Sequence, residues 1–260
     1  MMTADDITSG LKTRSFGHRV YAYQQTRSTN EIALRLGANG APNGALVIAE
    51  YQTAGKGRLG RSWISPPSRC ILASLLLRPT IQPYQTPVVT LLAAAAAANS
   101  IRDLTRLPAK IKWPNDVIIA GKKVCGILTE MGTGKSGQQF LAVGIGINVN
   151  IGKDSFPISL KSKATSLSIL LGYELPRIRL LQQFLLEFEN RYILLNRGNL
   201  APIISEVKSL SSILGRQVRI ESDEKAIVGQ AVDIDENGAL VLRLSIGTFE
   251  KVITGSVTLI

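Results

Sequence analysis

Short apolar runs that end at turn-forming residues alternate along the chain with longer segments of helical spacing. The runs at 45–51 and 71–77 are aliphatic and β-branched, which predicts two strands joined by a glycine-rich loop. Similar runs predict strands at 20–25, 117–120, 124–130 and 138–143. Helical spacing, proline near a helix start or an alanine-rich composition predicts helices after Ser28 and at 87–107, 163–171, 176–196 and 201–210.

The pattern changes after residue 210. Short strands are predicted at 217–220, 228–234, 239–244 and 251–259, and the sequence Asp235-Glu236-Asn237-Gly238 is a strong hairpin turn. We therefore predict an α+β protein of two domains. A mixed-sheet domain covers 1–210, and a small β barrel covers 211–260.

The loop between the strands at 45–51 and 71–77 has the composition of an anion site. Its glycines and cations are Gly55, Lys56, Gly57, Arg58, Gly60 and Arg61. Glycine lets a ligand approach the main chain, and backbone N–H groups beside fixed positive charge suit a phosphate or acyl phosphate. A dinucleotide fingerprint is excluded, because prolines follow instead of a helix and no acidic residue appears before Asp103. A P-loop is excluded because no Gly-Lys-Ser/Thr ends the loop.

Other candidate residues lie outside this loop. Ser28 is placed to cap the helix that follows it, with Glu31 completing a capping box, although a hydroxyl there also suits a ligand. The turn 112–116 gathers lysine, amide and carboxylate groups, and a hairpin turn at 121–122 places Lys123 near Asp116 or across from it. Asn148 follows two glycines and has the groups to read a base edge, or to stabilise a turn.

Composition narrows the classes of partner. Thirty Lys and Arg against nineteen Asp and Glu give a formal charge of +11, which favours an acidic protein, a nucleotide, nucleic acid or an anionic membrane. Aromatic residues are 5% of the chain and are not interleaved with a basic patch, which argues against a stacking surface for single strands. Fewer than thirty residues precede Ser28, too few for the usual DNA-binding module. The single histidine, His18, has no evident partner.

The cysteines and the apolar stretches indicate in which cellular compartment the protein is expected. Cys70 and Cys125 have neither metal-ligand spacing nor a disulfide framework. Residues 1–10 lack the apolar core of a signal peptide, and the most apolar stretch, 88–98, is shorter than the roughly 20 residues that span a bilayer. We expect a reduced, cytoplasmic protein that binds no membrane.

Five separated motifs now define a family resemblance. They are Ser28-Thr29-Asn30, the stretch 50–63, Lys112-Trp113-Pro114-Asn115-Asp116, Lys123-Val124-Cys125-Gly126-Ile127 and Gly144-Ile145-Gly146-Ile147-Asn148. In order and spacing the chain from Ser28 onward resembles the biotin protein ligases, in the short form that lacks an N-terminal DNA-binding domain. The resemblance implies the biotin/lipoate ligase type of catalytic domain followed by a small SH3-like β barrel. It does not imply binding to DNA.

The resemblance also implies a reaction and its participants. Biotin and MgATP would form biotinyl-5′-AMP, and a lysine of a biotin carboxyl carrier domain, of acetyl-CoA carboxylase or another biotin-dependent carboxylase, would then attack the activated carbonyl. The glycine loop would be disordered without ligand and fold over the adenylate. Related ligases are both monomers and dimers, so a homodimer through an exposed sheet edge is one expectation.

By the same resemblance each site residue has an implied role. Arg58 and Lys123 would be the catalytic cations, in contact with the biotin carboxylate and the adenylate phosphate. The implied biotin set is Ser28, Thr29, Asn30, Gln52, Gly55, Lys56, Gly57, Arg58, Lys123 and Gly126. The implied nucleotide set is Arg58, Arg61, Trp63, Lys112, Asn115, Asp116 and Asn148, with Mg²⁺ held mainly by ATP phosphates and Lys112 and Asp116 beside them.

Three positions depart from the family pattern. Lys56 replaces an arginine and keeps the charge without the planar fork, Ser68 stands in a stretch that usually has a glycine and an aromatic residue, and Ser256 replaces a glutamate. Two alternative functions stay open. A lipoate or octanoate protein ligase shares the fold, but the glycine-arginine loop with Lys-Trp-Pro-Asn-Asp favours biotin. A nucleic-acid-binding protein would fit the charge, but the chain has no recognised nucleic-acid motif.

Overall fold

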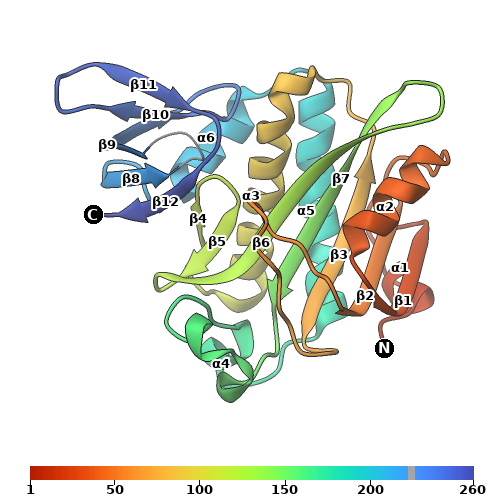
Figure 1. Cartoon of the computed structure of the whole chain (residues 1–260). Helices are drawn as coiled ribbons and strands as arrows, with labels where there is room; N and C mark the ends of the chain where they lie inside the picture. The colour runs from red at the N-terminus through yellow and green to blue at the C-terminus, as the bar shows by residue number, and fades with distance from the viewer. Residues whose placement is uncertain (222–225) are drawn as a thin grey trace.

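The computed structural model describes residues 1–221 and 226–260. Two sheets organise these residues (Figure 1). The larger has seven strands in the order β1-β2-β3-β7-β6-β5-β4, and the smaller has five in the order β11-β10-β9-β8-β12. Strands β1 and β2 pair in parallel, while the other pairs of the large sheet are antiparallel. The fold is therefore α+β with a mixed sheet, as predicted.

The strands of the large sheet are β1 (Val20–Thr26), β2 (Leu46–Gln52), β3 (Cys70–Leu77), β4 (Lys110–Lys112), β5 (Asp116–Ile119), β6 (Lys122–Thr133) and β7 (Gln139–Asn148). The helices are α1 (Ala4–Thr8), α2 (Thr29–Ala38), α3 (Thr86–Thr105), α4 (Leu167–Leu171), α5 (Arg177–Asn196) and α6 (Ala201–Leu210). The small sheet contains β8 (Gln217–Glu221), β9 (Ala226–Ile234), β10 (Leu240–Arg243), β11 (Phe249–Val252) and β12 (Ser256–Leu259).

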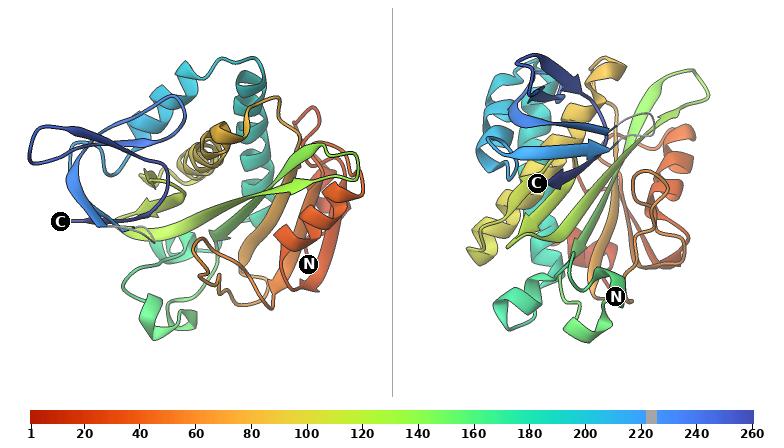
Figure 2. Two further views of the ribbon diagram at one scale, coloured as in Figure 1. Left: turned by 45° about the horizontal axis from the view of Figure 1, so that its top comes forward. Right: turned by 60° about the vertical axis from the view of Figure 1, so that its left-hand side comes forward.

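Helices cover both faces of the large sheet. Figure 2 shows α3 and α5 together on one face and α2 on the other. Helix α3 approaches the sheet closely because the side chains of its Ala93–Ala98 run are small and fully buried. None of the helices in the described part of the chain is both long enough and apolar enough to cross a membrane.

Several segments differ from the prediction, and α1 and β4 were not predicted. Strand β7 runs on through Gly144 and Gly146 to Asn148, because both glycines pair with β6 on one side and with β3 on the other. The sequence predicts that Gly37, Gly40 and Pro42 end the helix after Ser28. Helix α2 instead passes through Gly37 to Ala38, and a Cβ on Gly37 would lie 2.3 Å from the Phe140 ring, so this glycine permits close packing. The predicted helix at 163–171 is wrong in its first part, since α4 begins at Leu167. The single strand predicted at 251–259 is two strands, β11 and β12.

The two sheets meet beside the end of the large one. The Trp113 indole Nε1, in the turn after β4, donates to the Gly238 carbonyl in the hairpin turn before β10, at 3.0 Å. Lys208 of α6 pairs with Asp233 of β9 at 2.6 Å. All strands of the small sheet follow the predicted boundary at 210/211. That the two segments fold as separate domains stays a prediction.

Candidate active site

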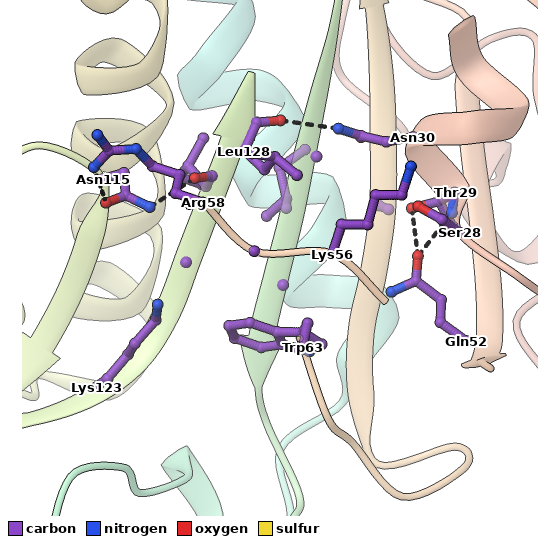
Figure 3. Close-up of a pocket in the computed structure, with 17 residues that line it drawn as sticks. Ser28, Thr29, Asn30, Gln52, Lys56, Arg58, Trp63, Asn115, Lys123 and Leu128 are labelled. Carbon is purple, nitrogen blue, oxygen red and sulfur yellow. Dashed lines mark hydrogen bonds between the residues drawn. The ribbon is translucent and has the colours of Figure 1, made fainter. Parts of the chain in front are cut away.

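Two adjoining pockets lie where α2, the glycine loop, β6 and β7 meet. The inner pocket is lined by Ser28, Thr29, Asn30, Gln52, Lys56, Gly57, Arg58, Trp63, Ala73, Asn115, Lys123, Gly126, Ile127, Leu128, Gly144, Ile145 and Gly146 (Figure 3). It lies on the α2 face of the sheet, because the start of α2 forms one wall and glycines of β6 and β7 form the floor. The outer pocket shares Gly57, Arg58, Trp63, Asn115 and Lys123 with it.

The end of the inner pocket beside α2 is polar and ordered by hydrogen bonds. The backbone N–H and the hydroxyl of Thr29 both donate to Gln52 Oε1, at 2.7 and 3.0 Å. Because Oε1 accepts these bonds, the Gln52 amide nitrogen is left as a donor, and it forms no hydrogen bond to the described residues. Thr29 and Asn30 are each 3% exposed, so this end of the pocket is enclosed as well as polar. Such an end suits a compact ligand group that both donates and accepts hydrogen bonds.

Glycines give the pocket its floor. A Cβ on Gly144 would lie 2.5 Å from Asn30 Oδ1, and a Cβ on Gly146 would lie 2.6 Å from the Trp63 ring. Gly126, the partner of Gly146 across β6 and β7, would bring a Cβ within 2.9 Å of the same ring. Side chains at these positions would therefore displace the walls of the pocket.

Two cations stand at the wall between the pockets. An Arg58 guanidinium N–H donates to Asn115 Oδ1 at 3.1 Å, and a second donates to the Thr254 hydroxyl. The Lys123 ammonium lies 2.6 Å from Asp116 Oδ1 and 5.4 Å from the centre of the Trp63 ring. Burial lowers the pKa of Arg58 from its ordinary value. An arginine guanidinium nevertheless stays charged in a protein, because its ordinary pKa is far above neutral pH. The wall thus offers positive charge to both pockets.

The outer pocket is basic and extends to the small sheet. It is lined in part by Arg58, Arg61, Trp63, Lys112, Asn115, Asp116, Asn148, Lys163, Gly255 and Ser256. Arg61 donates to the Ser256 hydroxyl at 2.7 Å. Ser256, one of the three positions that depart from the family pattern, therefore contacts the glycine loop. Asn148 donates from Nδ2 to the Thr165 carbonyl at 3.1 Å. This pocket has the charge expected for a polyanionic ligand.

The structure gathers most of the predicted residues in these pockets. All of the implied nucleotide set lines the outer pocket, and all of the implied biotin set except Gly55 lines the inner one. Gly55 is buried under Trp63, where its carbonyl accepts the Trp63 N–H at 2.9 Å and a Cβ would lie 2.6 Å from the Trp63 carbonyl oxygen. Gly55 therefore shapes the loop without lining either pocket.

The capping box predicted at Ser28 is wrong. Ser28 does precede the first helical residue of α2, but its side chain makes no capping hydrogen bond. Glu31 instead pairs with Lys56 at 2.8 Å, across the mouth of the inner pocket. Lys56 is thus held by an ion pair from α2, and Ser28 is left to line the pocket.

Sequence reasoning missed several residues that support the site. Ser74 of β3 contacts Thr29 and Asn30, Glu130 accepts a hydrogen bond from Asn30, and Thr254 accepts one from Arg58. Each is far along the chain from its partner. A single polar residue in the apolar run of β3 was the one local signal that could have pointed to Ser74.

The comparisons with known proteins agree with this geometry. Residues 21–150 match the model of the biotin/lipoate A/B protein ligase family, and residues 213–259 match the biotin protein ligase C-terminal domain. The chain is 39% identical over 246 residues to the bifunctional ligase/repressor BirA of Bacillus subtilis, covering 95% of this chain and 76% of that protein. The chain belongs to the biotin protein ligase family. The family matches fall on both sheets and on the strands that carry the pockets.

Two further relatives show how this family member compares. It is 36% identical over 225 residues to the biotin--[acetyl-CoA-carboxylase] ligase of Mycobacterium tuberculosis, covering 84% of this chain and 80% of that one. The biotin protein ligase of Aquifex aeolicus, solved in complex with biotin and ATP, superimposes with a TM-score of 0.81 at 27% identity, covering 93% of this chain and 98% of that one. The similarity to biotin protein ligases thus extends over both sheets.

Proposed function

We propose that the chain joins biotin to ATP as biotinyl-5′-AMP in the two pockets and then transfers biotin to a lysine of a carrier domain. The observation that carries this proposal is the placement of Arg58 and Lys123 in the wall shared by an enclosed, polar-ended pocket and a basic one. Biotin would occupy the inner pocket with its ureido group at the Thr29 and Gln52 end. ATP would occupy the outer pocket, where the solved Aquifex aeolicus relative with biotin and ATP offers a parallel.

Both chemical steps need stabilised negative charge. A carboxylate oxygen of biotin attacks the α-phosphorus of ATP, the bond to the β-phosphate oxygen breaks, and pyrophosphate leaves. The acceptor lysine, as a neutral amine, then attacks the carbonyl carbon, AMP leaves, and the amide loses a proton. Arg58 and Lys123, fixed by Asn115 and Asp116, would bring the carboxylate to the phosphate and stabilise the charge that builds up there.

The outer pocket fits a metal held mainly by the nucleotide. Asp116 is the only carboxylate lining the pocket among the described residues, and these residues include no group of three or more His, Cys, Asp or Glu that could hold a metal ion. Mg²⁺ commonly keeps phosphate and water ligands and takes one or two carboxylates. With Mg²⁺ bound, the phosphates would lose part of their charge, and Lys112 and Asp116 would lie beside them.

The acceptor protein, the cellular location and the oligomeric state belong to the same proposal. Relatives named biotin--[acetyl-CoA-carboxylase] ligases favour a biotin carboxyl carrier domain as the acceptor, and the excess positive charge favours an acidic one. A cytoplasmic location and a homodimer through an exposed sheet edge stay predictions. The proposal includes no role for DNA, and duplex binding that survives moderate salt would argue against that part of it.

The first test is biotin-dependent exchange of pyrophosphate into ATP with Mg²⁺, run beside lipoate and octanoate. We expect exchange with biotin and a loss of at least about a hundredfold in Lys123→Ala, since a fixed charge at the reacting group is removed. Lys135→Ala is the control, because Lys135 lies in the exposed turn between β6 and β7 and lines neither pocket. Exchange with lipoate and not with biotin would move the chain to the lipoate ligases. We do not expect that result, because the dithiolane ring of lipoate cannot use the hydrogen-bond donor and acceptor beside α2.

A further inference from the structure

Glu31, in the first turn of α2, forms an ion pair with Lys56 of the glycine loop. Its Oε1 lies 2.8 Å from the Lys56 ammonium. Its other oxygen, Oε2, lies 3.7 Å from Nε of Arg27, just before the helix, which also restrains the carboxylate. The hydrogen bond between the two groups lowers the pKa of Glu31 and raises the pKa of Lys56, so both are charged at neutral pH.

The Lys56 side chain crosses the mouth of the inner pocket. Figure 3 shows it extended from the glycine loop towards Asn30 at the start of α2. Lys56 lines the pocket, whereas Glu31 does not. The charge of Glu130, on β6, also raises the pKa of Lys56. Carboxylates of α2 and of β6 therefore both attract the ammonium to this position.

The inner pocket is too small for a ligand while its walls stay in place. It holds about 50 Å³ of free space, whereas pockets that enclose small molecules have roughly 300 Å³ or more. A ligand can therefore enter only when side chains of the wall move. Among the described residues, Glu31 and Lys56 form the only ion pair that joins α2 to the glycine loop, so opening at this side separates them.

The exposure of the pair suits a contact that opens often. The side chains of Glu31 and Lys56 are 34% and 46% exposed. Water screens an ion pair in such a position, and it contributes little to the stability of the fold. Breaking it should therefore change how often the mouth opens by only a few fold, without unfolding the helix or the loop.

We propose that Glu31 is a positioning residue that holds Lys56 across the mouth of the inner pocket and so slows both the entry and the release of the ligand. The inference rests on the proposed function for the identity of the ligand, biotin or its adenylate. Glu31 lines neither pocket and acts through Lys56. Because biotinyl-5′-AMP is a reactive mixed anhydride, slower release retains it for the acceptor lysine.

The first measurement is of the rate constants for biotin, with binding followed by stopped-flow mixing and release by chasing labelled biotin with unlabelled biotin. In Glu31→Gln both rate constants should rise about two- to fivefold, the range that an exposed ion pair supports. The dissociation constant should stay within about twofold, because the pair is lost from the empty and the occupied pocket alike. Adding Glu31→Gln to Lys56→Met should change nothing further, since the partner of Glu31 is already gone.

Trypsin cleavage of the ligand-free protein tests the same pair without biotin. Cutting after Arg58 and Arg61 should be about two- to fivefold faster in Glu31→Gln, because the glycine loop opens more often. Cutting after Lys135, in the exposed turn between β6 and β7, should not change.

Glu174→Gln is the matched control, because Glu174 pairs with Arg69 near the end of the same loop and lines neither pocket. It should leave the biotin rate constants and the trypsin cutting as they are in the unchanged protein. Unchanged cutting in Glu31→Gln would overturn the inference, and so would faster release that a weaker dissociation constant explains in full. If the unchanged protein binds no biotin, the proposed function fails, and the trypsin comparison still decides whether Glu31 holds the loop closed.

Discussion

Glu50 lies two residues before Gln52 at the end of β2, and its carboxylate is 2% exposed. Arg177 of α5 donates to it with two nitrogens, at 2.8 and 3.3 Å, and also to the Cys70 carbonyl at the start of β3. The Met2 N–H adds a hydrogen bond at 2.6 Å. One ion pair thus holds together the two strand ends from which the glycine loop departs.

The Glu50 charge predicts a pH-dependent contribution to stability. Burial alone would raise the pKa of Glu50, but Arg177 and the Met2 N–H outweigh it and lower the pKa below its ordinary value of 4.5. A carboxyl whose pKa is lower in the folded protein stabilises the fold above its unfolded pKa and loses that effect as the pH falls through the folded one. Glu50→Gln should therefore cost roughly 3 kcal/mol at pH 7, and the difference from the unchanged protein should shrink below about pH 4.5.

Urea unfolding between pH 3.5 and 7 measures this difference. Glu50→Gln combined with Arg177→Met should recover part of the loss, because no unpaired buried charge is left. A cost that is the same at every pH would show that packing, and not the ionised carboxylate, stabilises this corner.

Residues such as Glu50 and Ser74 explain what the sequence could not predict. The glycines and cations of the loop are consecutive, so local composition was enough to identify an anion site. Glu50 and Arg177 are 127 residues apart, and no pattern along the chain links them. Ser28 shows the opposite failure, since its local pattern fits a cap while the hydrogen bond that would make it one is not formed.

At the scale of elements, the glycine loop folds as a small hairpin between β2 and β3. The Gly57 N–H donates to the Arg61 carbonyl at 2.6 Å, and the Trp63 N–H donates to the Gly55 carbonyl at 2.9 Å. Few of its side chains are buried, since Lys56, Leu59, Gly60, Arg61 and Ser62 are all exposed. A segment with few buried contacts opens at low free energy, so ligands that contact it should change how often it opens.

Trypsin cleavage tests whether ligands close this loop. We expect cuts after Lys56, Arg58 or Arg61 in the free protein, and at least about tenfold slower cutting with biotin and MgATP at a hundred times their dissociation constants. Lys135, exposed between β6 and β7, is an internal control whose cleavage should not change. Equal rates at the loop with and without ligands would contradict the expected ordering.

Strand and helix boundaries were predictable where the local sequence pattern alone decides where an element begins and ends. Helix α6 has the predicted limits because its apolar face repeats at helical spacing and a proline stands near its start. The end of the chain was harder to read. Apolar residues continue from β11 to β12, and the break comes at Gly255, whose φ of +154° and close approach to Ile220 are properties of the folded sheet. From sequence alone, Gly144 and Gly146 fitted either a bulge or a close backbone approach, and only the folded pocket shows that the close approach applies.

For the whole molecule, the small sheet completes the outer pocket. Arg58 donates to Thr254 and Arg61 to Ser256, two hydroxyls in and before β12, and Trp113 is bonded to the turn before β10. Neutral hydroxyls hold the guanidinium groups without cancelling their charge. The C-terminal segment therefore contributes to the site by fixing where the cations of the glycine loop point, which no motif within the loop could have revealed.

Removing these two hydroxyls should weaken nucleotide binding and spare biotin. In Thr254→Val combined with Ser256→Ala, the KM for ATP in pyrophosphate exchange should rise about three- to tenfold, because two hydrogen bonds that orient Arg58 and Arg61 are lost. The KM for biotin should stay within about twofold, since no residue of the small sheet lines the inner pocket. Thr258→Val, an exposed threonine on the same strand, is the control and should change neither constant. If both constants rose together, the small sheet would be stabilising the fold as a whole, and its specific hold on the nucleotide side would be refuted.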